Sequence, residues 1–458
     1  MTAIDHALPP TPIGADRPDA AHADLREIDG RTVAFFHVDG REAGSSGAAE
    51  AEVVARALAL AEQIGCPVVG VVRSVAVAAD GFDALAAWGR VAARSVRLSG
   101  VVPLLLVVSG PVHGSLAPLI GLADHVVVTR DATAYVNGPR PVERVTGELV
   151  QPDQLGGAPV HATRSGLASL VADDEDDALR AVADLLDHLP DNNLAEAPVR
   201  PGPDPVTRRC TAAAAAVPAE PTRAYDVRDV IDDVFDEGSV LEVHADHAPN
   251  VVTAYARLAG RSVAIVANQP CVRAGTIDID ASGKAARHVQ GADALGLPLV
   301  TFVDTPGYEP GRDLEWRGMI RHGAKLVHAY SAATVPRLGV ILRKAYGGAY
   351  IVMDSRTTGN DLVLAWPTAE IAVMGAPGAV AILNRRDLDA ADDPAARRTE
   401  LEQEYQAKFL SPRLAAERGL VDQVIDPADT RRLLAAALGR LHTKRPALPD
   451  RRHANEPL

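Results

Sequence analysis

A paired glycine stands between aromatic residues in the stretch Arg343–Met353, which reads RKAYGGAYIVM. The apolar run before it predicts a buried strand, so the glycines fall where a strand passes into a helix. Glycine has no Cβ and adopts unusual φ angles, which lets a main chain approach a ligand closely. Amides at the start of a helix can stabilise a developing negative oxygen. Gly-Gly-Ala at 347–349 therefore predicts an oxyanion hole, and a tight turn that simply needs glycine is the alternative.

A weaker copy of this stretch, GPVHGSLAPL, occupies Gly110–Leu119 and belongs to a longer internal repeat. Three segments match in the same order and at nearly constant offset, which indicates two homologous halves. The matching segments are Gly65–Ser74 with Gly296–Thr305, Ser99–Ser115 with Ala332–Gly348, and Ala123–Pro139 with Asp361–Pro377.

Short apolar runs such as 101–108 and 335–342 are typical of strands buried on both faces. Helical patterns separate them, and one predicted helix carries a buried stripe. That stripe consists of Trp316, Met319, Ile320, Gly323, Val327 and Tyr330. Alternating strands and helices predict an α/β fold in each half.

The chain is expected to divide into four parts. Residues 1–25, rich in Pro, Ala and Asp, are predicted to form a disordered arm, and 26–197 the N-terminal domain. Six prolines and the run CTAAAAAVP make 198–221 a predicted linker, which leaves 222–458 as the C-terminal domain.

Composition limits the classes of function. The chain has 458 residues, is 47% hydrophobic and 23% charged, and carries a net charge of −14, which disfavours nucleic-acid binding. We find no secretory signal and no apolar run long enough to span a membrane. The three cysteines are far apart and form no zinc motif, so a cytoplasmic protein is expected.

Several catalytic motifs are missing from the sequence. We find no dinucleotide-binding glycine motif, no phosphate-binding loop and no G-x-S-x-G elbow. The only methionines are Met1, Met319, Met353 and Met374, so the chain has no Met-Lys-Met biotin-attachment motif.

Four segments carry a resemblance to a known family: VDTPGYEPG (303–311), GMIRHGAKLVHAY (318–330), ATVPRLGVILRKAYGGAYIVM (333–353) and AWPTAEIAVMGAPGAVAIL (365–383). They resemble the carboxyltransferase (β) subunit of biotin-dependent acyl-CoA carboxylases of the propionyl-CoA and acetyl-CoA type. The resemblance implies two tandem crotonase-like domains of the ClpP/crotonase superfamily, related by internal duplication. It implies carboxybiotin on a separate carrier chain, a biotin carboxylase partner, an acyl-CoA substrate and no metal. It also implies a hexamer whose active sites lie between halves of different subunits.

By this resemblance, the biotin-side oxyanion hole falls on Gly348 and Ala349, with Gly347 shaping the turn. The acyl-side hole falls on Gly114 and Ser115. Ile351 takes the place where the family varies with acyl length, and an apolar residue there resembles the acetyl or broader type. The remaining candidates for substrate binding are Tyr346, His113, Arg73, Asp304, Gly307 and Arg343.

The N-terminal half departs from the family pattern. The family's DSGGARIQEG loop reads RSVAVAADG at Arg73–Gly81, so its glycine pair and arginine are lost and Arg73 replaces an acid. This leaves two alternatives to carboxyl transfer: a biotin-independent decarboxylase of a malonyl-type thioester, and a non-catalytic β-like subunit that assembles with an active paralogue.

Three other features have two interpretations each. His113 beside the second hole is a candidate general acid or base, or a packed, hydrogen-bonded histidine. His244-Ala245-Asp246-His247 is a candidate metal cluster or an ordinary loop. Arg343 either attracts an anionic part of a substrate or pairs with an acid across an interface.

Overall fold

The computed structural model describes residues 11–12, 20–40, 47–75 and 82–444, together with 446, 448–450 and 452–457 near the C-terminus. The chain forms two compact units. The first comprises the described residues up to Pro198 with Val243–His247 and Ala294–Gly296, and the second comprises Val199–Glu242, Ala248–Asp293 and the residues from Leu297 onward.

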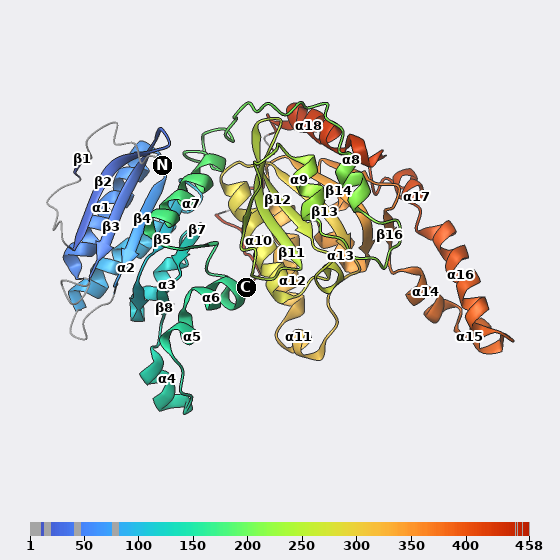
Figure 1. Ribbon diagram of the computed structural model, residues 1–458, viewed down its shortest axis with the longest axis horizontal. Helices are drawn as coiled ribbons and strands as arrows, with labels where there is room; N and C mark the ends of the chain where they lie inside the picture. Colours follow the sequence, from blue (N-terminus) through green and yellow to red (C-terminus); the bar gives the residue numbers. More distant parts are fainter. Residues whose placement is uncertain are drawn as a thin grey trace. The chain divides into compact units, whose positions relative to one another are not determined.

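The first unit is built on a sheet of order β1-β2-β3-β4-β5-β7-β9, in which β2 and β3 are antiparallel and the strands from β3 to β9 are parallel (Figure 1). The strands are β1 (Thr11–Pro12), β2 (Ala21–Ile28), β3 (Arg31–Asp39), β4 (Val68–Arg73), β5 (Leu104–Val108), β6 (Pro111–His113), β7 (His125–Thr129), β8 (Thr133–Tyr135) and β9 (Leu170–Ala172). The helices are α1 (Ala48–Ile64), α2 (Phe82–Leu98), α3 (Ala117–Ile120), α4 (Pro139–Thr146), α5 (Pro152–Gly156), α6 (Ala158–Val160) and α7 (Glu175–His188).

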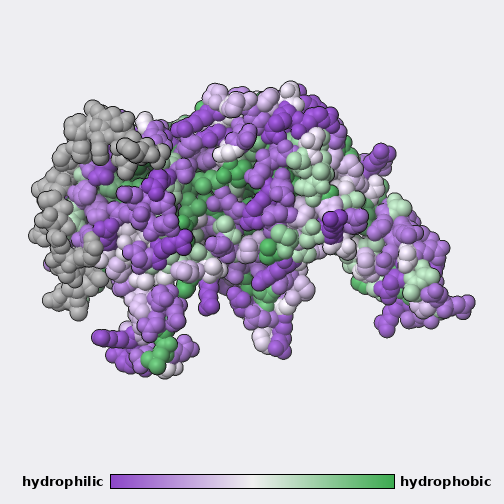
Figure 2. Space-filling view, in the orientation of Figure 1, coloured by the Kyte–Doolittle hydropathy of each residue, from purple (hydrophilic) through white to green (hydrophobic). Residues whose placement is uncertain are grey.

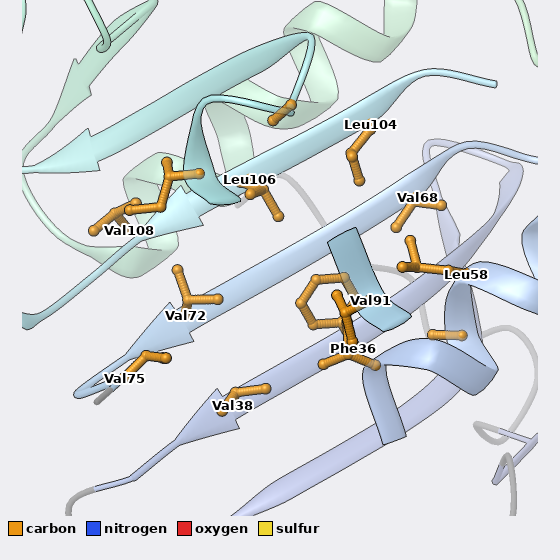
Figure 3. Packing of buried hydrophobic residues seen from close by; sticks show 14 of the residues in the cluster. Phe36, Val38, Leu58, Val68, Val72, Val75, Val91, Leu104, Leu106 and Val108 are labelled. Atoms are coloured by element: carbon orange, nitrogen blue, oxygen red, sulfur yellow. The ribbon is translucent and has the colours of Figure 1, made fainter. Parts of the chain in front are cut away.

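The core of this unit lies between the sheet and helices α1 and α2. Figure 3 shows Phe36 of β3 beside Val91 of α2, with the side chains of β4 and β5 extending along the same layer. Gly70 makes this packing possible, because a Cβ there would stand 2.1 Å from the Phe36 ring.

The second unit repeats the plan with the order β10-β11-β12-β13-β14-β15-β17, and β16 pairs with the far end of β14. Its strands are β10 (Leu241–Val243), β11 (Val251–Leu258), β12 (Arg261–Asn268), β13 (Leu299–Thr305), β14 (Arg337–Tyr346), β15 (Leu362–Ala365), β16 (Glu370–Ala372) and β17 (Gln423–Val424). Its helices are α8 (Thr211–Ala216), α9 (Arg228–Val234), α10 (Ile279–Ala294), α11 (Arg312–Trp316), α12 (Met319–Ala332), α13 (Gly347–Val352), α14 (Ala376–Leu383), α15 (Arg385–Ala390), α16 (Pro394–Phe409), α17 (Pro412–Glu417) and α18 (Thr430–Leu441).

Both units therefore have an antiparallel pair followed by parallel strands, as the internal repeat predicts. They differ where the glycine turn is reached. In the second unit, β14 runs unbroken to Tyr346 and pairs with both β15 and β16. In the first, the chain breaks after β5, and β6 pairs with β8 in a separate two-stranded sheet. The break falls at Ser109 and Gly110, and Pro111 begins β6 after it.

Two predicted boundaries are wrong. Residues 21–25 were expected within a disordered arm, but they belong to β2. The expected linker at 198–221 is part of the second unit: its alanine run forms α8, and Cys210 and Ala213 are fully buried in that unit's core. Alanine is a strong helix former, and the small apolar side chains pack under the sheet.

The predicted stripe through Trp316 and Tyr330 is also partly wrong. The helix is broken at Gly318, which has a φ of +94°. Trp316 and Ile320 are 75% and 83% exposed, whereas Met319, Gly323, Leu326, Ala329 and Tyr330 are buried in α12. Among the described residues, no helix has both the length and the apolarity to cross a membrane.

Candidate functional site

The glycine pair of the second unit forms a sharp turn between β14 and α13. Tyr346 still has extended φ and ψ angles, and Gly347 then adopts a φ of +56° as the first residue of the helix. A side chain at Gly347 would be strained, and its Cβ would lie 3.1 Å from the carbonyl oxygen of Val373. Glycine at 347 is thus required by the conformation of the turn.

The next two amides, of Gly348 and Ala349, are available to a ligand. They lie in the first turn of α13, where a helix provides no acceptor. Within the part of the chain that the structure describes, neither amide donates to a backbone carbonyl outside the helix. Gly348 is exposed while Ala349 is buried, so one side of this turn faces solvent. This geometry is the one that an oxyanion hole needs.

The first unit contains the same turn. His113 at the end of β6 is extended, Gly114 has a φ of +78°, and a short helical segment, Gly114–Leu116, continues into α3. Gly114 therefore matches Gly347, the residue that shapes the turn. The amides that match those of Gly348 and Ala349 belong to Ser115 and Leu116. The prediction had placed the acyl-side hole on Gly114 and Ser115, one residue earlier than this equivalence.

His113 and Tyr346 precede the two turns, and both side chains contact a neighbouring strand. His113 stacks on Tyr135 with ring centroids 4.0 Å apart, and its Nε2 lies 3.0 Å from Thr133 Oγ1. Burial lowers the pKa of His113. Tyr346 donates its hydroxyl hydrogen to Glu370, and burial, followed by this bond, raises the pKa of the tyrosine. These contacts agree with the packed, hydrogen-bonded interpretation of His113.

Asp304 and Arg343 form a buried ion pair. Their Oδ2 and Nε atoms are 2.7 Å apart, and the side chains are 1% and 3% exposed. Nη1 of Arg343 also donates to the carbonyl oxygens of Arg223, at 2.7 Å, and Glu220, at 3.0 Å. Of the two roles predicted for Arg343, the structure shows pairing with an acid, and that acid is in the same unit. The pair fixes the end of β13 against β14.

Arg73 takes the place of Asp304 in the first unit, with the opposite charge. Its Nη2 lies 2.5 Å from Glu175 Oε2, its Nε 3.4 Å from Ser109 Oγ and its Nη1 3.7 Å from Asp39 Oδ2. Gly110 stands where the second unit has Arg343, and a Cβ there would be 2.8 Å from Arg73 Cγ. Arg73 fills the space of the missing arginine. The remainder of its loop, 76–81, lies outside the described residues.

The remaining predicted residues divide between turn and surface. Gly307 has a φ of +140°, and its amide and carbonyl bond to Thr305 Oγ1 and the Ile277 amide. Ile351 is 48% exposed on α13, one turn beyond the glycine pair.

The His244–His247 segment has neighbours of its own. Within the described ranges, no group of three or more His, Cys, Asp and Glu side chains is placed to hold a metal ion. His244 Nε2 instead lies 3.2 Å from Ser169 Oγ. Both residues line a cavity of about 490 Å³ in the first unit, which the sequence pattern did not reveal.

The sequence-based interpretation also missed the partners of the turn residues: Thr133, Tyr135, Glu175 and Glu370. The repeat match does not reveal them, because the block Ala123–Pro139 with Asp361–Pro377 sets Thr133 against Ile371, whereas the strand registers make Thr133 equivalent to Glu370.

Fold and turns together define a duplicated crotonase-like protein with one candidate oxyanion hole in each half. The Carboxyl transferase domain family matches residues 22–456. The chain therefore belongs to the carboxyl transferase family, whose members are transferase enzymes.

Three similar proteins illustrate the family. The carboxyltransferase subunit of propionyl-CoA carboxylase from Haloferax mediterranei is 47% identical over 436 residues, which are 94% of this chain and 84% of that protein. The α subunit of methylmalonyl-CoA decarboxylase from Propionigenium modestum is 41% identical and is covered to the same extents. The solved structure of the transcarboxylase 12S hexamer, with methylmalonyl-coenzyme A and methylmalonic acid bound, has a TM-score of 0.92 and 44% identity. The match covers 97% of this chain and 86% of that one.

Proposed function

We propose that the protein moves a carboxyl group from carboxybiotin, held on a partner carrier chain, to the α-carbon of a short acyl-CoA. The observation that carries this proposal is the pair of turns at Gly347 and Gly114, each of which leads to main-chain amides at the start of a helical segment. Relatives named as a propionyl-CoA carboxylase subunit and a methylmalonyl-CoA carboxyltransferase subunit support the substrate class.

In this proposal main-chain amides stabilise the negative charge that develops on the reacting oxygens. Carboxybiotin supplies the carboxyl group, and its loss places negative charge on the ureido oxygen of biotin. The amides of Gly348 and Ala349 donate to that oxygen. The amides of Ser115 and Leu116 donate to the thioester oxygen as the acyl α-carbon gives its proton to the ureido nitrogen of biotin and forms a bond to the CO₂ that carboxybiotin releases. A hole of this kind contributes about 3–4 kcal/mol for each donor.

The conformation of each turn sets the direction of these donors. Because Gly347 and Gly114 adopt positive φ, the amides that follow are oriented before a substrate arrives. The buried Asp304–Arg343 pair stiffens the strand end beneath the biotin-side turn, since Asp304 also accepts the Lys344 amide at 3.2 Å. Neither of these charged groups is assigned a contact with substrate.

Ile351 favours an acceptor with a short acyl chain. Its side chain is 48% exposed on the helix that begins at Gly347, where it can contact an acyl chain. An apolar residue accepts acetyl and propionyl groups with little discrimination, because one methylene is worth only about 1–3 kcal/mol.

The protein is proposed to act in an assembly. A biotin carboxylase and carrier chain supplies carboxybiotin, and halves of different subunits meet in a hexamer, which is the assembly described for the transcarboxylase relative. Large apolar side chains exposed at Val145, Leu149, Val373 and Leu383 support such contacts, and Figure 2 shows apolar surface at the tip of the segment containing α4. All three cysteines are free thiols, which supports a cytoplasmic location.

The test is transfer by the purified full-length chain. Methylmalonyl-CoA and free biotin are supplied together, and formation of propionyl-CoA and carboxybiotin is measured against reactions that lack biotin. Biotin-dependent formation of propionyl-CoA supports the proposal. Failure of transfer in both directions, with acetyl-CoA and propionyl-CoA as acceptors and a carboxylated biotin carrier as donor, contradicts it.

One relative favours a second candidate. The methylmalonyl-CoA decarboxylase subunit is 41% identical to this chain, and oxyanion holes that stabilise an enolate serve decarboxylation as well. Loss of CO₂ from methylmalonyl-CoA at an equal rate with and without biotin would select a biotin-independent decarboxylase. Inertness in every assay, together with co-purification with another β chain, would select the non-catalytic subunit.

A further inference from the structure

The residues just before the two glycine turns, His113 and Tyr346, were expected to bind substrate. Instead, the side chain of each contacts a neighbouring strand, β8 for His113 and β16 for Tyr346. Each residue directly precedes the glycine of its turn. This arrangement suggests a mechanical role in the transfer.

In the second unit, the link runs diagonally between β14 and β16. The register sets Tyr346 opposite Ala372, and the tyrosine hydroxyl reaches Glu370, two residues earlier on β16. The tyrosine ring also packs closely against Gly375, where an added Cβ would lie 3.0 Å from Tyr346 Cε2. Tyr346 is 9% exposed, so its bond to Glu370 is largely shielded from water.

In the first unit, the same diagonal joins β6 and β8. His113 stands opposite Tyr135, and its Nε2 contacts Thr133 Oγ1, again two residues earlier on the partner strand. The Tyr135 ring stacks on the imidazole, as Gly375 packs against the tyrosine ring. Two different residue pairs thus make one link at matching positions. The link is common to the two units although its chemistry is not.

A glycine at positive φ explains why such a link is useful. Gly347 and Gly114 have φ angles of +56° and +78° and no side chain to anchor them, so the peptide planes that follow can rotate more freely than elsewhere. The preceding residue is the nearest one that packing can fix. We propose that Tyr346–Glu370 and His113–Thr133 are positioning pairs that hold the glycine turns, so that the following amides point at the two enolate oxygens. This inference rests on the proposed function.

The test on the biotin side is Tyr346→Phe in the full-length protein, assayed with methylmalonyl-CoA and free biotin. Loss of the hydroxyl should lower kcat roughly tenfold to a hundredfold, because small misplacements of catalytic groups cost rates of that order, and should leave KM for both substrates unchanged. Glu370→Gln keeps a carbonyl acceptor for the hydroxyl and should retain most of kcat. Tyr330→Phe is the matched control, since it removes another buried tyrosine bond, to Thr301 at 3.0 Å, away from the turn.

On the acyl side, Thr133→Val removes the hydroxyl at nearly constant volume and should lower kcat, whereas Thr133→Ser should restore it. His113→Gln separates positioning from acid–base catalysis. Its amide can still reach Thr133, so the pH profile of kcat should keep its wild-type shape. A lost limb of that profile would show that His113 transfers protons, which would overturn its positioning role.

Hydrogen exchange provides a measurement that needs no activity. Tyr346→Phe should increase the exchange rate of the hydrogen-bonded amides of the β14–β16 ladder, at 344–346 and 370–372, and Tyr330→Phe should not. Wild-type exchange and wild-type kcat in both Tyr346→Phe and Thr133→Val would overturn the inference. An inactive wild-type protein that still shows the exchange difference would contradict the proposed function and leave the positioning of the turns supported.

Discussion

The two units place opposite charges at the same point of one fold. Where the second unit ends β13 with Asp304 and pairs it with Arg343 of β14, the first ends β4 with Arg73 and has Gly110 in the arginine's place. The acid that completes the first pair comes from the start of α7, at Glu175. An ion pair beneath the glycine turn is therefore present in both units, although its members come from different elements.

The pairs differ in how completely they are buried. The side chains of Asp304 and Arg343 are almost inaccessible. Besides their bond to each other, they form three hydrogen bonds to main-chain groups. The side chains of Arg73 and Glu175 are 28% and 27% exposed. Solvent screens a half-open pair, and a closed pair cannot lose one member without leaving a bare charge. We expect the biotin-side turn to be the more rigid of the two.

The largest expected effect is the difference in folding stability lost when the arginine of each ion pair is replaced. Arg343→Met should destabilise the second unit by about 3–5 kcal/mol, because it leaves the Asp304 carboxylate buried and unpaired. Arg73→Met should cost less than about 1 kcal/mol, since its pair is partly solvated. Urea denaturation of both variants measures the difference, and equal losses would show that burial does not distinguish the units.

Acid should act selectively on the second unit. His288 of α10 is buried, its Nε2 lies 3.1 Å from the Ala254 carbonyl oxygen, and burial lowers its pKa to about 4. The stabilisation from the neutral ring is complete above the ordinary value of 6.5 and is lost as the pH falls toward 4, by about 3 kcal/mol. The repeat register sets Ala57 of α1 at the matching position, which therefore carries no titratable group in the first unit.

Hydrogen exchange at pH 7 and pH 4.5 checks this expectation. Protection of the β11–β13 amides should fall more than that of β3–β5, and His288→Gln should reduce the difference. A uniform loss in wild-type protein would attribute the acid sensitivity to other groups.

A smaller effect tests whether the Arg73 side chain occupies the space beside Gly110. Gly110→Ala should destabilise the first unit by about 1–3 kcal/mol, because the new Cβ meets Arg73 Cγ at 2.8 Å. The double variant Gly110→Ala, Arg73→Ser should recover much of that loss. Purely additive free energies of unfolding in the double-mutant cycle would contradict the view that Arg73 occupies the missing arginine's space.

The duplication, the strand order near the turns and both glycine turns could be predicted from the sequence, because buried parallel strands have a clear apolar pattern and positive φ favours glycine. The partners of charged side chains could not. Glu175 is a hundred residues from Arg73, and nothing in periodicity links them. The predicted buried stripe through Trp316 was wrong because Gly318 breaks the helix. The predicted linker was wrong because its prolines suggested a flexible segment, whereas Cys210, Ala213 and Val217 are buried in the second unit's core.

The central claim is that the amides of Gly348 and Ala349 stabilise a negative oxygen on biotin. The most direct measurement is kcat for biotin-dependent decarboxylation of methylmalonyl-CoA by Gly348→Val, with Gly439→Val, at an exposed helical glycine with open space around it, as the matched control. Gly348 has only ordinary contact with the Tyr308 ring, 3.5 Å from its Cβ position, so the variant should fold. We predict a loss of about 10²–10³ in kcat for Gly348→Val and none for Gly439→Val. Wild-type kcat in a folded Gly348→Val protein would contradict the account.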